Sequence, residues 1–176
     1  MLDKDRELVE RIQNPESRNA AFRELMSLYQ EKLYSHIRRM VGNHTDADDV
    51  LQNTFVKVYR HINKFKGDAK LYTWLYKIAS NEALTYLNKE TKMRSVTFEP
   101  QHAKTGFRPG PDGEEIGHKL KQAIATLPEK QRQVFDLKYF EDLKYEEIAE
   151  ITGTSVGGLK ASYYHAVKKI EAFLTH

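Results

Sequence analysis

The segment from Phe65 to Asn81 gathers aromatic, basic and amide side chains around a glycine. Aromatic rings beside cations suit unstacked single-stranded bases, and each stacked base contributes about 1–3 kcal/mol. The amide of Asn81 can hydrogen-bond the edge of a base taken out of the stack. Residues 57–94 carry nine lysines and arginines against three acidic residues. These features predict nucleic-acid binding; the alternatives are a solvated basic face and, for Trp74, packing in a core.

Residues 145–174 have the pattern of a helix-turn-helix. Gly153 lies where the chain must turn sharply, and Ser155 can cap the second helix. Such a unit lays its second helix in the DNA major groove, where lysines suit phosphates and small residues permit close approach. The predicted outward residues of that helix are Gly158, Lys160, Ala161, Tyr164, His165, Lys168 and Lys169. The alternative is a helical hairpin that binds nothing.

The stretch from Asp46 to Arg60 predicts a helix with an acidic outward face. The residues expected on that face are Asp48, Asp49, Gln52, Asn53 and Val56. A negative surface with an exposed valine suits a protein partner. A metal site is the competing idea, because His44 precedes three closely spaced aspartates. Successive helix positions point in different directions, however, so we expect no metal ion there.

Apolar residues at three- and four-residue spacing predict that helices position all these groups. The first such stripe is Phe22, Leu25, Met26, Tyr29, Leu33, Ile37 and Met40. Gly42-Asn43 ends this helix, and Thr45 to Asp48 have the layout of a capping box for the next one. The second stripe is Ala47, Val50, Leu51, Phe55, Val58, Tyr59 and Ile62, and the third is Leu71, Leu75, Ile78, Ala79, Ala83 and Leu87.

Prolines and glycines cluster between about 95 and 113, where apolar periodicity stops, which is typical of a flexible linker. Periodicity resumes at Ile116, and the predicted inward face of the last helix is Val156, Leu159, Tyr163, Ala166, Ile170 and Leu174. We therefore predict an all-α fold of two small helical domains, 1–94 and 116–176, joined by a linker over 95–115.

Composition narrows the functional classes. The 176 residues are 40% apolar and 30% charged, with no cysteine and no apolar run near the roughly 18–20 residues of a membrane helix. The first residues lack the layout of a secretory signal, so we expect a cytoplasmic protein without disulfides or membrane insertion. The seven histidines form no metal or base pattern, and no phosphate-binding loop is present. We expect no catalytic residues, no cofactor and no enzyme activity.

Taken together, these motifs resemble extracytoplasmic-function (ECF) sigma factors of the sigma-70 family. Residues 46–59 are similar to the helix of sigma region 2 that binds core RNA polymerase. Residues 65–81 are similar to the segment that melts the promoter and reads its −10 element. Residues 127–135 and the helix-turn-helix are similar to region 4, which reads the −35 element. The resemblance runs from about Phe22 to Phe173 and leaves the linker unmatched in detail.

The resemblance implies three surfaces and their partners. Contacts to the clamp helices of the largest polymerase subunit fall on Asp48, Asp49, Gln52, Asn53, Phe55 and Val56. Contacts to −10 DNA fall on Phe65, Lys66, Gly67, Asp68, Tyr72, Lys77 and Asn81, with Trp74 and Tyr76 as packed supports. Contacts to −35 DNA fall on Ser155, Gly158, Lys160, Ala161, Tyr164, His165 and Lys168. The flap of the polymerase and an inhibitory anti-sigma factor are further implied partners, and the chain is expected to be a monomer active in stress or envelope signalling.

The recognition helix departs from the family pattern. Where the family often has Gly-Thr-Val-Lys-Ser-Arg, residues 157–162 read Gly-Gly-Leu-Lys-Ala-Ser, which predicts weaker −35 affinity. Asn53 also stands where the family usually has an acid. Two other classes compete with the sigma interpretation: a DNA-binding regulator whose first half senses a ligand, and a helical scaffold such as an anti-sigma protein. The acidic helix argues against the former, and the helix-turn-helix argues against the latter.

Overall fold

The computed structural model describes residues 3–96 and 114–175, and within them every element is a helix. The chain divides into two compact units, Met1–Lys89 and Glu90–His176, so the predicted all-α fold of two helical domains is confirmed. The first unit contains α1 (Asp3–Gln13), α2 (Arg18–Val41), α3 (His44–His61), the 3-10 helix η1 (Ile62–Lys64) and most of α4 (Leu71–Val96), whose last residues lie past the boundary at Lys89. The second contains α5 (Glu114–Ala125), α6 (Glu129–Tyr139), α7 (Tyr145–Thr152) and α8 (Val156–Leu174).

Most of the predicted linker, residues 97–113, lies outside the described residues. No helix in the described ranges is long and apolar enough to cross a membrane.

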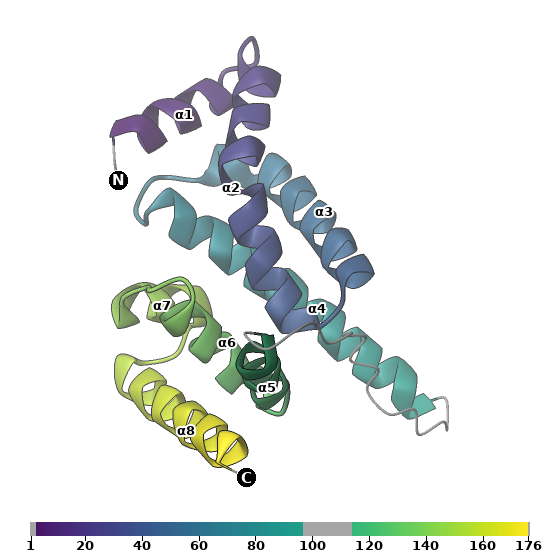
Figure 1. Cartoon of the computed structure of the whole chain (residues 1–176). Coiled ribbons are helices and arrows are strands. Elements are labelled where there is room, and N and C mark those ends of the chain that lie inside the picture. The colour runs from purple at the N-terminus through teal and green to yellow at the C-terminus, as the bar shows by residue number, and fades with distance from the viewer. Residues whose placement is uncertain (1–2, 97–113, 176) are drawn as a thin grey trace. The chain divides into compact units, whose positions relative to one another are not determined.

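Helix α2 forms the centre of the first unit, with α1, α3 and α4 packed around it (Figure 1). The predicted stripes are buried where these helices meet, because an apolar face one helix wide must be covered by its neighbours. The buried members are Phe22, Leu25, Leu33, Ile37 and Met40 on α2, Ala47, Val50, Phe55 and Val58 on α3, and Leu71, Leu75, Ala79 and Ala83 on α4.

One buried polar contact joins α2 to α4. Nε2 of His36 lies 2.8 Å from Oγ of Ser80, and the ring of Tyr76 meets the imidazole edge-on at a centroid distance of 5.2 Å. His36 and Ser80 are completely buried. An unpaired polar group at such depth costs about 1–3 kcal/mol, so the pair fixes how α4 sits on α2.

The start of α3 differs from the prediction. The capping residue is Asn43, whose Oδ1 accepts a hydrogen bond from the backbone N–H of Asp46 at 2.9 Å. Gly42 takes a left-handed φ of 95° and ends α2, which leaves Asn43 in the extended conformation that a capping residue needs. The predicted capping box from Thr45 to Asp48 is therefore wrong, and the helix begins before it.

The second unit packs α5, α6 and α7 against α8. Its core contains Ala123, Ile124, Leu127, Phe135, Ala166 and Ile170, with Leu120, Tyr163 and Val167 partly buried against it. The prediction that Leu174 faces this core is wrong: the side chain is 40% exposed. It lines an open hollow between α5 and α8 instead of being covered.

Candidate functional site

A groove of about 600 Å³ runs between α2 and α3 in the first unit. Its lining combines an apolar floor with polar edges: Phe22, Met26, Gln30, Asp48, Asp49, Leu51, Gln52, Phe55, Val56, Tyr59 and Arg60. Five of the six residues predicted to bind polymerase are among them. The sixth, Asn53, is exposed on α3 but outside the lining.

The floor of the groove is built from rings. Phe22 meets Phe55 and Tyr59 edge-on, at centroid distances of 6.3 and 4.9 Å. The guanidinium of Arg18 lies over the ring of Tyr59, 4.2 Å from its centroid, and donates a hydrogen bond to the backbone oxygen of Tyr59 at 2.7 Å. Only 7% of Phe55 is exposed, so this predicted contact residue serves mainly as floor.

The edge of the groove carries the groups that a partner can reach. Val56 is 43% exposed, and Asp48 and Asp49 are exposed about two turns before it on α3. A partner helix with apolar residues flanked by bases would complement this surface. The contribution of α2 to the groove was not predicted, because Phe22 and Met26 have the spacing of ordinary core residues.

The loop before α4 divides the predicted −10 residues into a buried base and an exposed tip. Phe65 is 8% exposed, and its ring lies 5.2 Å from that of Trp74. Lys66 and Asp68 are exposed on either side of Gly67, which has a φ of 80° that favours glycine. The tip can therefore meet DNA, whereas Phe65 supports it from inside.

The first turns of α4 continue this surface. Lys77 and Asn81 are exposed and four residues apart, which puts them on one face of the helix. Tyr72 is partly exposed, and its hydroxyl accepts a hydrogen bond from Nζ of Lys70 at 3.2 Å. These side chains supply one amide and two cations, Lys70 just before α4 and Lys77 within it.

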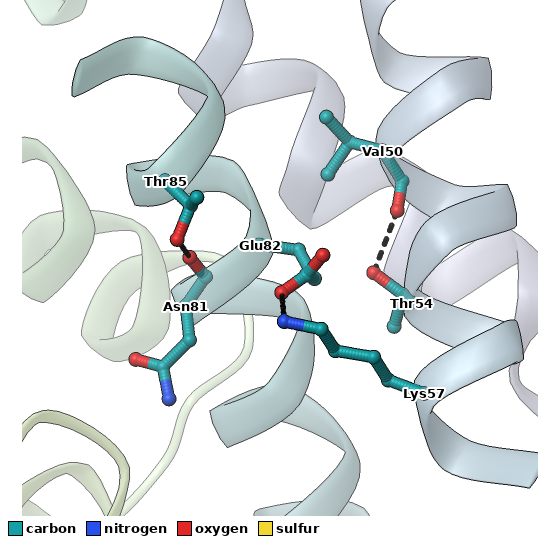
Figure 2. A network of polar contacts seen from close by, with 6 residues as sticks. All are labelled: Val50, Thr54, Lys57, Asn81, Glu82 and Thr85. Carbon is teal, nitrogen blue, oxygen red and sulfur yellow. Dashed lines mark hydrogen bonds and ion pairs between the residues drawn. The ribbon is translucent and has the colours of Figure 1, made fainter. Parts of the chain in front are cut away.

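Figure 2 shows how Asn81 is presented. Its backbone oxygen accepts a hydrogen bond from Oγ1 of Thr85 at 2.7 Å, while its side-chain amide points away from the ion pair between Lys57 of α3 and Glu82 of α4. The ion pair joins the two helices at Glu82, the residue next to Asn81. The side-chain amide of Asn81 is thus exposed on α4, which the adjacent ion pair joins to α3.

In the second unit, the predicted turn and cap of the helix-turn-helix are confirmed. Gly153 ends α7 with a φ of 69°, and its N–H donates to the backbone oxygen of Ala149 at 2.8 Å. Oγ of Ser155 accepts a hydrogen bond from the N–H of Gly158 at 3.2 Å and so caps α8. The residues predicted to contact −35 DNA are all exposed: Ser155, Gly158, Lys160, Ala161, Tyr164, His165 and Lys168.

The charges on this face of α8 are only partly available. Lys168 lies 2.9 Å from a carboxylate oxygen of Glu171. The hydrogen bond to Glu171, and the opposite charge of that residue, raise the pKa of Lys168. Lys160 sits over the ring of Tyr145 at 5.8 Å, and Tyr164 is 58% exposed. A phosphate must therefore compete with Glu171 for one of the two predicted lysines.

Both halves of the chain match known families. The sigma-70 region 2 model matches residues 25–93, and the sigma-70 region 4 model matches residues 117–170. The chain belongs to the sigma-70 family. As a sigma factor it is a transcription initiation factor and not an enzyme. The region 2 match contains the groove apart from Phe22, the loop and the start of α4, and the region 4 match contains the helix-turn-helix.

Relatives over nearly the whole length place this sigma factor in the ECF group. The chain is 35% identical to the RNA polymerase sigma-H factor of Pseudomonas aeruginosa, over 98% of this chain and 94% of the relative. It is 33% identical to the ECF RNA polymerase sigma-E factor of Escherichia coli K12, over 95% and 92%.

Two solved structures share the fold at 22% sequence identity. CnrH, in complex with the cytosolic domain of CnrY, superposes with a TM-score of 0.72 over 98% of both chains. The sigma factor RpoE of Bartonella quintana, in complex with the anti-sigma factor NepR, superposes with a TM-score of 0.77 over 88% of this chain and 96% of the other.

Proposed function

We propose that this ECF sigma factor directs core RNA polymerase to promoters used in stress or envelope signalling, and that three surfaces divide the work. The groove between α2 and α3 binds polymerase, the loop 65–70 with the start of α4 melts and reads −10 DNA, and α8 reads −35 DNA. The assignment corresponds to domains 1–94 and 116–176 with a linker over 95–115. Its main support is that the predicted contact residues, apart from Phe55 and Phe65, are exposed or partly exposed.

The shape and charge of the groove support its role. Its apolar floor and the acidic residues Asp48 and Asp49 suit a basic amphipathic helix, and the family resemblance assigns the clamp helices of the largest polymerase subunit to this surface. Val56 offers an apolar contact at the edge. An apolar centre with a charged rim is the usual anatomy of a protein interface.

The chemistry of the loop and α4 supports capture of a flipped base. The amide of Asn81 offers both donors and an acceptor to the edge of a base, and Lys66 and Lys77 can neutralise the phosphates on either side. Because Phe65 is buried, its role in this proposal is to hold the loop rather than to stack on DNA.

The remaining partners follow from the family. Bartonella quintana RpoE is bound by an anti-sigma factor, and we expect a protein of that kind to inhibit this chain by covering the polymerase-binding groove. We also expect a monomer that works in the cytoplasm, where polymerase and promoter DNA are found.

Run-off transcription tests the proposal. Core polymerase would be combined with the chain and with fragments of its own genome, and transcripts that require the chain would be mapped. Asp49→Ala should abolish binding to core polymerase, because it removes a charge at the edge of the groove. Asn81→Ala should leave core binding intact and abolish melting, and Lys160→Ala should weaken only the −35 contact.

Matched variants control for charge and for folding. Glu7→Ala removes an exposed carboxylate from α1, Asn88→Ala removes an exposed amide farther along α4, and Lys130→Ala removes an exposed lysine from α6. All three should transcribe like the wild type. The surface assignments would be refuted if Asp49→Ala bound core polymerase normally, or if Asn81→Ala still melted the promoter.

A further inference from the structure

Helix α1 lies outside the region 2 match, yet it is built firmly into the first unit. Its apolar residues Leu8, Val9 and Ile12 are buried, and the helix contacts both α2 and η1. An ion pair of 2.9 Å joins Arg11 to Glu24 of α2. These contacts hold α1 firmly against α2 and η1.

The end of α1 is bonded to the start of the −10 loop. Nε2 of Gln13 donates hydrogen bonds to the backbone oxygens of Ile62, at 3.1 Å, and Phe65, at 3.3 Å. These two carbonyls bracket η1, and the N–H of Phe65 also donates to the oxygen of Ile62. One side chain of α1 thus bonds the backbone where the loop begins, although Gln13 is 49 and 52 residues away from its two partners in the sequence.

A second interaction of α1 is with α2, near the residue that follows the loop. Tyr29 of α2 is hydrogen-bonded to Asp5 of α1 and lies close to Tyr72 of α4. Burial, followed by the charge of Asp5 and this hydrogen bond, raises the pKa of Tyr29 to about 12. α1 is thus bonded to the beginning of the loop through Gln13, and its Asp5 interacts with Tyr29 of α2, which lies close to the tyrosine that follows the end of the loop.

We propose that α1 is a clasp for the −10 loop and that Gln13 is a positioning residue for base capture. The loop 65–70 has an exposed tip around a glycine of positive φ, and Gln13 bonds the backbone where the loop begins. Without the clasp it would spend part of its time in other conformations, and apparent affinity falls with the fraction that is competent. This inference rests on the proposed function of the loop.

The test compares two neighbouring substitutions that add the same charge. Gln13→Glu replaces the donor by a carboxylate facing two carbonyl oxygens. Asn14→Asp adds a carboxylate one residue later, where the side chain accepts a hydrogen bond from the N–H of Glu16 at 3.1 Å and can still do so. Gln13→Ala, which removes the donor without adding charge, covers the case in which Gln13→Glu fails to fold.

The probe is a single-stranded DNA oligonucleotide selected by the wild-type holoenzyme from a randomised pool. Loss of two hydrogen bonds should weaken oligonucleotide binding by Gln13→Glu holoenzyme about tenfold, with Gln13→Ala affected in the same direction. Affinity for core polymerase should stay within twofold of wild type for both, and Asn14→Asp should match wild type throughout. A loss of core affinity that parallels the loss of oligonucleotide binding would mean general destabilisation and would overturn the proposal.

Asn81→Ala distinguishes a failure of the clasp proposal from a failure of the proposed −10 function on which it rests. If Asn81→Ala binds the oligonucleotide as well as wild type does, the assignment of the −10 surface fails, and the clasp fails with it. If Asn81→Ala loses binding while Gln13→Glu and Gln13→Ala retain it, the −10 surface stands and only the clasp is overturned.

Discussion

At the scale of single residues, the two adjacent glycines of α8 have different surroundings. A Cβ added at Gly157 would meet nothing within 4 Å. A Cβ at Gly158 would lie 3.2 Å from Cγ2 of Thr154 and 3.3 Å from Oγ of Ser155, the oxygen that caps the helix. From the sequence, the small residues of this helix, Gly158 among them, are expected to permit close approach of DNA. For Gly158, the cap of the helix itself is a sufficient reason.

This difference predicts different changes in stability for the same substitution at the two positions. Gly157→Ala should raise the free energy of unfolding by roughly 0.5–1 kcal/mol, because alanine loses less backbone entropy in a helix. Gly158→Ala should gain less, or lose, because its Cβ crowds the capping hydroxyl. Urea unfolding followed by circular dichroism measures both, and equal stabilisation by the two variants would contradict the crowding argument.

Tyr29 gives a prediction at alkaline pH. Its pKa is about 12 in the folded chain and about 10 in an unfolded one, so the folded state holds the proton more tightly. The contribution to stability is complete below pH 10 and is lost as the pH rises from 10 to 12. Tyr29→Phe should remove this loss, so the stability gap between wild type and variant should shift in favour of the variant across that range.

The measurement is urea unfolding of both proteins at pH 8 and at intervals between pH 10 and 12. Tyr164→Phe is the control, because Tyr164 is 58% exposed and belongs to the other unit. It should leave the pH dependence as in wild type. Parallel curves for wild type and Tyr29→Phe would show that burial does not hold the proton on Tyr29.

At the scale of elements, the contact between His36 and Ser80 should couple α2 to α4. His36→Leu leaves a buried hydroxyl without this partner and should cost about 1–3 kcal/mol. Ser80→Ala should also destabilise the chain, since it takes a partner from the imidazole. The double variant should cost less than the sum of the single ones, by an interaction energy of about 0.5–3 kcal/mol. Strict additivity in a double-mutant cycle would show that the 2.8 Å contact carries no coupling.

The faces of several helices, and some helix ends, could be predicted from the sequence alone. Apolar periodicity identified the faces of α2, α3 and α4, because a stripe one helix wide is a property of neighbouring positions. The turn at Gly153 and the cap at Ser155 could be predicted for the same reason, since their partners lie within four residues. Local chemistry was ambiguous for α3, where Asn43 and Thr45 are both good capping residues.

The features that could not be predicted from the sequence depend on contacts between segments that are far apart in the chain. Phe22 and Met26 are half of a groove only because α2 lies beside α3. Gln13 bonds backbone oxygens, which carry no sequence signal at all. His36 is polar in an apolar stripe, and its partner Ser80 lies 44 residues away. Phe65 was expected at the DNA for the same reason: its burial beneath a loop follows from tertiary packing.

At the scale of the whole molecule, each of the two surfaces proposed to read DNA is small. The −10 surface has one amide and a few lysines, and the −35 surface has two predicted lysines, one of which is paired with Glu171. Few phosphate contacts mean low affinity and a shallow dependence on salt. Two surfaces that each bind DNA weakly give high combined affinity only when the distance between them is fixed, because binding of the second surface is then intramolecular.

We therefore predict that the isolated chain binds duplex promoter DNA weakly and that core polymerase confers tight, specific binding. With a fluorescent promoter fragment from the run-off experiment, the chain alone should give a dissociation constant of about 1 μM or weaker at physiological salt, in the range of non-specific binding. Holoenzyme should bind the same fragment orders of magnitude more tightly and discriminate against a scrambled −10 element. Lys160→Ala should reduce holoenzyme affinity for fragments that contain the −35 element and leave fragments without it unaffected. Nanomolar, sequence-specific binding by the chain alone would contradict the argument, because it would mean that the two surfaces need no polymerase to act together.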